Sequence, residues 1–216
     1  MGIIELKKYT KKFGNKTVFE NFDLSIEQGE LIALTGPSGS GKTTLLNVIG
    51  LIDPLEHGSY SLANETAPKN NTRNANKVIR EKISYLFQNF ALVDNLTVEE
   101  NLRMALRYVK KSKKEKEEDM KAALIQVGLA GYAKQKVFEL SGGEQQRVSI
   151  ARAIIKPSTI ILADEPTGSL DPENRDEIMS ILEYLNKEEG KTIVIVTHDL
   201  EIAKRCDRIV KLNPLE

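Results

Sequence analysis

A glycine-rich octapeptide, placed between an apolar run and a helical pattern, constrains the fold of this chain more than any other segment. Residues 36–43 read GPSGSGKT, with a buried strand candidate before them at 30–35 and a helix candidate at 42–49. A strand that passes through a loop of this glycine spacing into a helix predicts a phosphate-binding loop. The flanking strand and helix make a chance glycine-rich turn a poor explanation. We therefore expect a nucleoside triphosphate to bind at this loop.

The loop residues have separate chemical roles in this interpretation. Glycines let the backbone curl so that successive N–H groups point at a phosphate, and the positive end of the following helix adds to the attraction. Lys42 is expected to contact the β- and γ-phosphates, and Thr43 to hold Mg²⁺ through its hydroxyl. The residues expected to bind the nucleotide here are Gly36, Ser38, Gly39, Ser40, Gly41, Lys42, Thr43 and Thr44.

A second apolar run ends in two carboxylates. Residues 160–165 (IILADE) predict a strand that presents Asp164 and Glu165 at its carboxyl end. Asp164 suits Mg²⁺, usually through water, because that ion gives up its hydration reluctantly. Glu165 is placed to polarise an attacking water, the role of a general base. Alone, the pair would be better explained as solvated side chains that open the turn at Pro166, and the phosphate-binding loop favours the functional interpretation.

Short apolar runs alternate with helical patterns along much of the chain, which favours an α/β fold with a central sheet. Three further runs are typical of central strands: residues 83–87, 159–163 and 192–196. The N-terminal part differs, because it predicts antiparallel strands at 3–7 and 18–26 joined by a turn at Gly14-Asn15. His57 is expected in a turn, with a structural role.

The segment from residue 88 to residue 155 is almost purely helical in its pattern. Thr97 and Glu100 form a capping box ahead of apolar residues at helical spacing, and Gly128 ends a second helical pattern. The mixed charges at 110–121 are typical of a solvated helix face. A helical subdomain inserted into a sheet domain is expected.

Bulk composition excludes several classes of protein. Thirty-one basic residues balance thirty-one acidic ones, so no net field attracts nucleic acid or an anionic membrane. The single cysteine, Cys206, cannot form an internal disulfide and is typical of a reducing compartment. No apolar run approaches the roughly 20 residues needed to span a bilayer, and the N-terminus has no signal-peptide pattern. A soluble intracellular protein is expected, with any membrane part supplied by another chain.

Residues 140–145 (LSGGEQ) narrow the interpretation from NTPases in general to one family. Ser141 and Glu144 form a capping box, but capping does not explain Gly142 and Gly143, since two glycines in a first helical turn cost stability. Glycines make sense there if a phosphate must approach the backbone closely. Together with the phosphate-binding loop, this string makes the chain resemble the nucleotide-binding subunits of ABC transporters, in which it is the signature motif.

The resemblance implies an α/β fold: a P-loop NTPase (RecA-like) core with an N-terminal antiparallel β subdomain and an inserted helical signature subdomain. Residues 1–216 would form a single ABC ATPase domain. Within it, residues 1–88 and 156–216 would be the nucleotide-binding core, and residues 89–155 the helical subdomain.

The resemblance also implies roles that the residues alone do not fix. Gln88 would touch the metal and the lytic water and relay the nucleotide state to a membrane subunit. His198, after the last central strand, would contact the γ-phosphate. Phe13 matches the position of an aromatic that stacks on adenine, commonly a tyrosine. A core or hairpin role for Phe13 remains open, and Tyr9 is the competing candidate.

In the family, the signature helix faces the γ-phosphate held by the other subunit, so that two chains sandwich two ATP molecules with Mg²⁺. The signature residues that would contact this nucleotide are Ser141, Gly142, Gly143 and Glu144. The implied catalytic residues are Glu165, His198, Gln88 and Lys42. The implied metal-binding residues are Thr43, Gln88 and Asp164.

Residues 162–171 (LADEPTGSLD) resemble the branch of lipoprotein-release, macrolide-export, bacteriocin- or peptide-defence and cell-division ATPases. Ser169 departs from the asparagine of many members, and Ser169-Leu170-Asp171 matches a loop that crosses the dimer interface. Asp171 is also a plausible helix cap before Pro172. The branch implies a homodimer on ATP binding and a permease with few spans and a large extracytoplasmic domain. The ATPase would then be cytoplasmic, on the inner face of the cell membrane, and drive extrusion or mechanical transmission.

Three alternatives remain open from the sequence. An import ATPase would share every motif, although many importers carry an added C-terminal regulatory domain. An ATP-driven switch that controls cell-wall or envelope enzymes through a membrane partner would have the same ATPase. Nucleic-acid or ribosome-acting members usually carry a long coiled coil or two ATPase units. This sequence shows neither pattern and its charge is balanced, so no nucleic-acid partner is expected.

Overall fold

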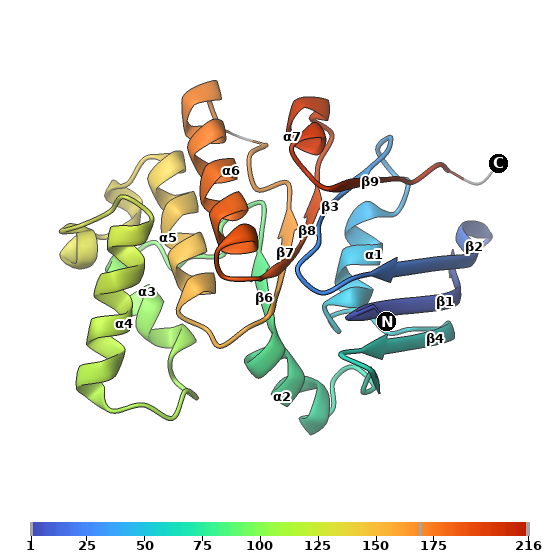
Figure 1. Ribbon diagram of the computed structural model, residues 1–216, viewed down its shortest axis with the longest axis horizontal. Coiled ribbons are helices and arrows are strands. Elements are labelled where there is room, and N and C mark those ends of the chain that lie inside the picture. The colour runs from blue at the N-terminus through green and yellow to red at the C-terminus, as the bar shows by residue number, and fades with distance from the viewer. Residues whose placement is uncertain (1, 169, 215–216) are drawn as a thin grey trace.

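Five parallel strands form the central sheet of the computed structural model, which describes residues 2–168 and 170–214 (Figure 1). Their order is β6-β7-β8-β3-β9. The strands are β3 (Leu31–Thr35), β6 (Ile83–Leu86), β7 (Ile160–Asp164), β8 (Thr192–Val196) and β9 (Arg208–Lys211). The first four confirm the predicted central strands. The sequence did not predict β9, a short strand at the sheet edge whose side chains are largely exposed.

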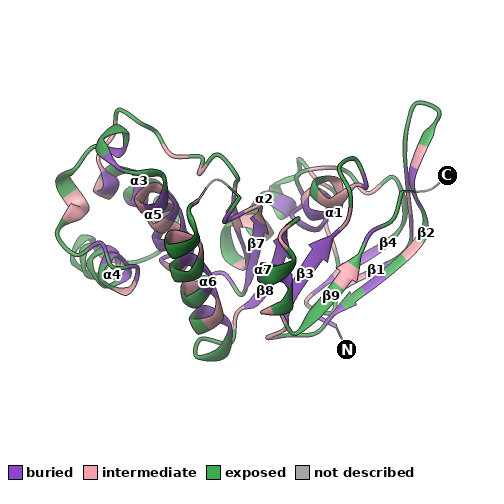
Figure 2. Cartoon of the chain, turned by 90° about the horizontal axis from the view of Figure 1, so that it is seen from above, coloured by how far each residue is buried: buried purple, intermediate pink, exposed green. Residues whose placement is uncertain are grey.

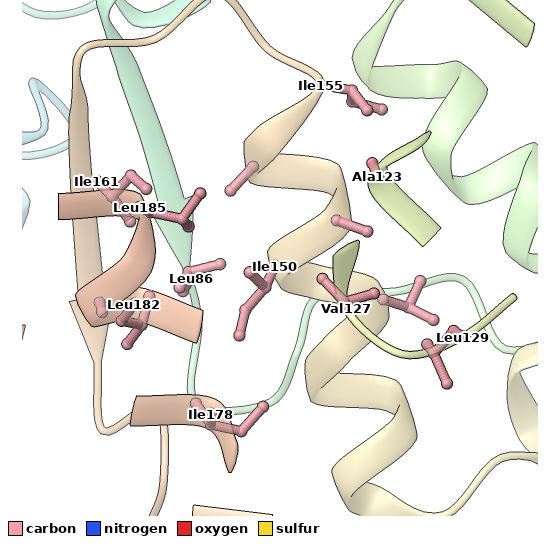
Figure 3. Packing of buried hydrophobic residues seen from close by; sticks show 14 of the residues in the cluster. Leu86, Ala123, Val127, Leu129, Ile150, Ile155, Ile161, Ile178, Leu182 and Leu185 are labelled. Carbon is pink, nitrogen blue, oxygen red and sulfur yellow. The ribbon is translucent and has the colours of Figure 1, made fainter. Parts of the chain in front are cut away.

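The central strands are apolar on both faces because both faces are covered. On one face, side chains such as Leu86 pack with α5 (Gly142–Ile154) and α6 (Pro172–Lys187), as Figure 3 shows. On the other face, side chains such as Leu162 pack with α1 (Lys42–Ile49) and the N-terminal strands. Figure 2 shows the buried residues concentrated on the central strands and the inward helix faces. Because both faces are packed against other elements, the central strands are held in place, and so are the ends of the loops that connect to them.

A second, antiparallel sheet lies beside α1, with the strand order β2-β1-β4-β5 (Figure 1). Its strands are β1 (Ile4–Phe13), β2 (Lys16–Ile26), β4 (His57–Leu62) and β5 (Glu65–Thr66). Phe13 pairs with Lys16, which confirms the predicted turn at Gly14-Asn15. The expected turn at His57 is wrong, because His57 opens β4 and pairs with Thr10 of β1. The strand has few apolar residues, so its pattern gave no signal.

The helical part consists of three α-helices and two short 3₁₀ turns. They are α3 (Val98–Ala105), α4 (Lys113–Gln126), η1 (Tyr132–Lys134), η2 (Val137–Glu139) and α5. Capping boxes at Thr97 and Ser141 confirm the predicted helix starts, and a third at Ser112 was not predicted. Leu102 of α3 and Leu124 of α4 belong to the same buried cluster as the sheet residues. The helical part and the central sheet therefore share one buried cluster.

Two further helices complete the described chain. The first, α2 (Arg73–Lys82), is capped by Thr72, and the second, α7 (Leu200–Lys204), is capped by Asp199. The sequence predicted neither. In the ranges 2–168 and 170–214, no helix combines the length and the apolar character required to cross a bilayer.

Candidate functional site

Four adjacent strands deliver the predicted site residues to one edge of the central sheet. The phosphate-binding loop follows β3, and the carboxylate pair lies at the end of β7. Gln88 comes two residues after β6, and His198 two residues after β8. Ligands of parallel α/β sheets bind outside the carboxyl ends of the strands. The strand order therefore gathers segments that are more than a hundred residues apart in the sequence.

These residues line a cavity of about 480 Å³. Six of its lining residues come from the phosphate-binding loop and the first turn of α1: Ser38, Gly39, Gly41, Lys42, Thr43 and Thr44. Five more come from the other predicted positions: Phe13, Gln88, Asp164, Glu165 and His198. Gly36 and Ser40 are not among the described residues that line the cavity. Ser40 is buried.

Two glycines are required by the shape of the loop. Gly36 has φ +148°, and a Cβ there would lie 2.3 Å from the Leu212 carbonyl oxygen. Gly41 has φ +92°, and its Cβ would lie 2.6 Å from atoms of Val18 and Phe19. The loop is thus pressed between β2 and the segment after β9. The Lys42 ammonium donates to the Gly36 carbonyl at 2.8 Å and to the Pro37 carbonyl at 2.9 Å, which holds it along the loop.

Thr43 and Asp164 meet across the site. The Thr43 hydroxyl donates to Asp164 Oδ1 at 3.2 Å, although the residues are 121 positions apart. Burial raises the pKa of Asp164, the hydrogen bond from Thr43 lowers it, and the neighbouring Glu165 charge raises it. A hydroxyl and a carboxylate are oxygen ligands of the kind that Mg²⁺ takes together with water and substrate phosphates. The described residues hold no cluster of three metal-binding His, Cys, Asp or Glu side chains.

Glu165 and His198 form a second polar pair. Nδ1 of His198 lies 2.9 Å from Glu165 Oε1. The other carboxylate oxygen, Oε2, is buried and has no hydrogen-bond partner within the described ranges. Glu165 also has φ +48°, the left-handed region that is uncommon for residues other than glycine. A buried acceptor without a partner, on a strained backbone in a cavity wall, is the arrangement expected of a group that binds a water or substrate atom.

The structure separates the two candidates for adenine stacking. Tyr9 is fully buried, and its ring lies 5.1 Å from that of Phe19, centroid to centroid. Phe13 is 54% exposed at the end of β1 and lines the cavity. Tyr9 is therefore a core residue, and Phe13 has the accessible ring face. Lys16 and Val18 of β2 also line the cavity, and nothing in the sequence pattern distinguished them from ordinary strand residues.

The signature residues lie outside this cavity. The Ser141 hydroxyl accepts from the Glu144 N–H, and Glu144 Oε2 accepts from the Ser141 N–H, so the capping box closes the start of α5. Gly143 is explained by packing, because its Cβ would lie 2.2 Å from Asn174 Oδ1. Gly142 is exposed, and its Cβ would have only Leu170 Cδ2 within 4 Å, at 3.8 Å. Nothing inside the described chain requires a glycine at position 142.

The expected interface loop is partly described. Ser169 lies outside the described residues. Asp171 caps α6 by accepting from the Asn174 N–H, as predicted, and Pro172 occupies the first turn. Asn174 is in turn held by Arg147 of α5, whose guanidinium donates to Asn174 Oδ1 at 2.9 Å. The loop after β7 is thereby coupled to the signature helix.

Comparisons with known proteins agree with this geometry. The family model described as ABC transporter matches residues 19–168. The macrolide export ATP-binding/permease protein MacB of Campylobacter jejuni is 42% identical over 211 residues, which are 98% of this chain and 33% of that protein. The ABC transporter ATP-binding protein MJ0796 of Methanocaldococcus jannaschii is 41% identical over 219 residues, 98% of this chain and 93% of that protein.

Solved structures of that second relative have the same fold. Its dimeric cassette structure has a TM-score of 0.88 at 39% identity and covers 97% of this chain and 94% of that one. A dimeric post-hydrolysis state bound to ADP and Pi has a TM-score of 0.87 at 38% identity, and covers 99% and 97%. The chain spans about a third of the length of the MacB relatives. With a family match over most of its length and a nucleotide cavity at the expected sheet edge, the chain belongs to the ABC transporter family and is an ABC ATPase that uses ATP with Mg²⁺.

Proposed function

We propose that two copies of this domain bind two ATP molecules head to tail and that hydrolysis drives a membrane permease of the export or mechanical-transmission class. The observation that carries the proposal is Gly142, an exposed glycine at the start of a helix, for which packing among the described residues gives no reason. A helix start with exposed N–H groups suits a phosphate, and the absence of a side chain lets one approach. The chain's own nucleotide cavity does not include it, so a second subunit's nucleotide is the fitting occupant.

In the proposed mechanism the residues of the cavity have distinct chemical roles. Lys42 and the loop N–H groups neutralise charge on the transferred phosphoryl group, as does His198. Glu165 accepts a proton from the attacking water and aligns that water, while Gln88 contacts it from the β6 side. Thr43, Asp164 and Gln88 would hold Mg²⁺, which supplies further charge neutralisation when bound. The signature helix of the partner completes the site around the γ-phosphate.

The composite site predicts opposite effects of Gly142→Ala on stability and on activity. Stability is expected to stay constant or rise, because alanine is the better helix former by up to ~1 kcal/mol and the position has space. Hydrolysis is expected to fall by about 10²-fold, the loss typical of one displaced charge-stabilising donor. Thermal unfolding and phosphate release at saturating Mg-ATP measure the two effects.

Gly143→Ala is the matched comparison. Its Cβ would meet Asn174, which Arg147 and Asp171 hold in place, so this variant should lose stability by about 1–3 kcal/mol as well as activity. A Gly142→Ala variant that hydrolyses ATP at the unaltered rate would contradict the composite site.

A second surface supports coupling to a permease. A groove of about 590 Å³ lies between the core and the helical part, lined by residues that include Ile52, Tyr85, Phe87, Met104 and Tyr108. Ile52, Met104 and Tyr108 are 42%, 47% and 64% exposed. Exposed apolar side chains gathered in one place mark interaction sites. Phe87 in the groove directly precedes Gln88 in the nucleotide cavity, so this groove is adjacent to the site of hydrolysis.

We assign this groove to an apolar cytoplasmic segment of the permease. The MacB relatives carry ATP-binding and permease functions in one protein of which this chain matches a third, so a permease is the partner that such an ATPase would face. Their names also favour export. The domain would then lie on the inner face of the membrane, attached through the permease.

Tyr108→Asp is expected to abolish association with the permease and to leave basal hydrolysis unchanged, because a carboxylate in an apolar contact is costly to bury. The measurement is a pull-down in which the tagged Glu165→Gln protein, with and without Tyr108→Asp, captures partners in Mg-ATP from detergent-solubilised membranes. Tyr184→Asp is the control, since Tyr184 is 51% exposed on α6 outside the groove. Recovery of a few-span permease that Tyr108→Asp abolishes supports the proposal. Recovery of a many-span importer permease, or of ribosomes or DNA, contradicts it.

A further inference from the structure

Lys11 is a charged residue that the fold buries beside the proposed adenine site. It is 7% exposed, and its ammonium forms an ion pair with Glu56. The same ammonium lies 4.8 Å from the centroid of the Phe13 ring. Burying a charge is costly unless it is well paired, so an ordinary solvated lysine does not explain this position.

Irregular strand pairing aims Lys11 at this place. Lys11 and Phe13 are two residues apart on β1, and the Lys11 ammonium reaches the Phe13 ring. The pairing of β1 with β2 shifts register on both sides of Lys11. On the other edge of β1, Thr10 pairs with His57, which brings Glu56 next to the strand. Register shifts of this kind redirect side chains and occur near functional sites.

The Phe13 ring borders two different groups. It lines the nucleotide cavity together with Lys16 and Val18, and the Lys11 ammonium lies over one of its faces. Lys11 is not among the described residues that line the cavity. An exposed phenylalanine at a hairpin end would otherwise be free to change rotamer, and a cation over one ring face opposes that.

We propose that Lys11 is a positioning residue that holds the Phe13 ring from one face, so that the other face stacks on the nucleotide base. The inference rests on the proposed nucleotide site and on Phe13 as its base-stacking residue. Lys11 would act only on the base, because its contacts are Glu56 and Phe13 and not the phosphate-binding loop. The competing explanation is that the Lys11–Glu56 pair only ties β1 to β4.

The test compares two ligands that differ by the nucleoside. Lys11→Met keeps the length and apolar stem of the side chain and removes the charge. Calorimetry should find that the affinity for Mg-ADP falls by about 3- to 10-fold, the scale of a cation–π contact, and that the affinity for Mg-pyrophosphate is unchanged. Lys11→Arg keeps a cation and should restore Mg-ADP binding. Lys12→Met, on the exposed neighbour, is the matched control and should change neither affinity.

A double-mutant cycle separates positioning from a general structural role. In a Phe13→Ala background, Lys11→Met should cause no further loss of Mg-ADP affinity, because the ring it holds is absent. Equal losses for Mg-ADP and Mg-pyrophosphate, or a full further loss in the Phe13→Ala background, would overturn the inference and leave Lys11 as a strand tie. If the unmodified protein bound no Mg-pyrophosphate, the nucleotide site itself would be wrong.

Discussion

Glu165→Gln is expected to stop hydrolysis while ATP stays bound, and to trap a dimer. The amide has the shape of the carboxylate and can keep the contact with His198, now 2.9 Å from Glu165 Oε1, but it cannot accept the proton of the attacking water. General-base catalysis typically contributes 10²–10⁴-fold, so phosphate release should fall by at least ~10²-fold. Gln would adopt the same strained backbone conformation, φ +48°, as Glu165. The thermal unfolding temperature of the protein should therefore be unchanged.

The trapped state follows from linkage. If ATP binds the closed dimer better than the monomer, a protein that cannot hydrolyse ATP accumulates as the dimer. Light scattering should give a dimer mass for Glu165→Gln in Mg-ATP and a monomer mass in Mg-ADP. Glu173→Gln, at an exposed position of α6, is the control and should hydrolyse ATP normally. A monomer at saturating Mg-ATP would count against the sandwich for the isolated domain.

Lys42→Ala is expected to remove both hydrolysis and nucleotide-driven association. The Lys42 ammonium donates to the carbonyls of Gly36 and Pro37, so it is held along the loop where phosphates would bind. Loss of one preorganised donor to developing charge typically costs 10²–10³-fold, and here the nucleotide would also bind more weakly, so the fall in hydrolysis should be at least ~10²-fold. Phosphate release and light scattering in Mg-ATP measure the two losses.

Lys77→Ala, on the exposed face of α2, is the control for lost positive charge. It should keep both activities, because Lys77 is not among the described residues that line the nucleotide cavity. An unaltered hydrolysis rate in Lys42→Ala would rule out the active-site assignment of the loop.

Local signals in the sequence predicted the elements that carry the site. The helix expected at 42–49 matches α1 at both ends, and Gly41 in the left-handed region is its N-cap. Both predicted capping boxes are present, because a cap involves residues only three positions apart. Among the elements that were missed, the strands β4 and β9 have short or polar patterns and are held by pairing with β1 and β3. Such strands depend on partners that a local pattern does not contain.

The alternatives at Tyr9 and Phe13 needed the tertiary structure. Both are aromatic residues close to the predicted turn at Gly14-Asn15, so the sequence alone could not choose between them. In the fold, Tyr9 lies in the part of the strand covered by Phe19, while Phe13 lies at the hairpin end beyond that cover. The same holds for the two signature glycines, which are alike in sequence. Packing against Asn174 requires Gly143, whereas a Cβ at Gly142 would have only Leu170 Cδ2 within 4 Å among the described residues.

The sequence by itself determined the family, the nucleotide and the chemistry available, because the loop at 36–43, the string at 140–145 and the Asp164-Glu165 pair are contiguous and carry their function in their own residue types. The tertiary structure decided which of these groups meet. Thr43 reaches Asp164, and Glu165 reaches His198, only because β7 and β8 lie next to one another and β8 lies next to β3. The strands take this order within a sheet that is buried on both faces, and that arrangement is a property of the whole chain that no short segment contains.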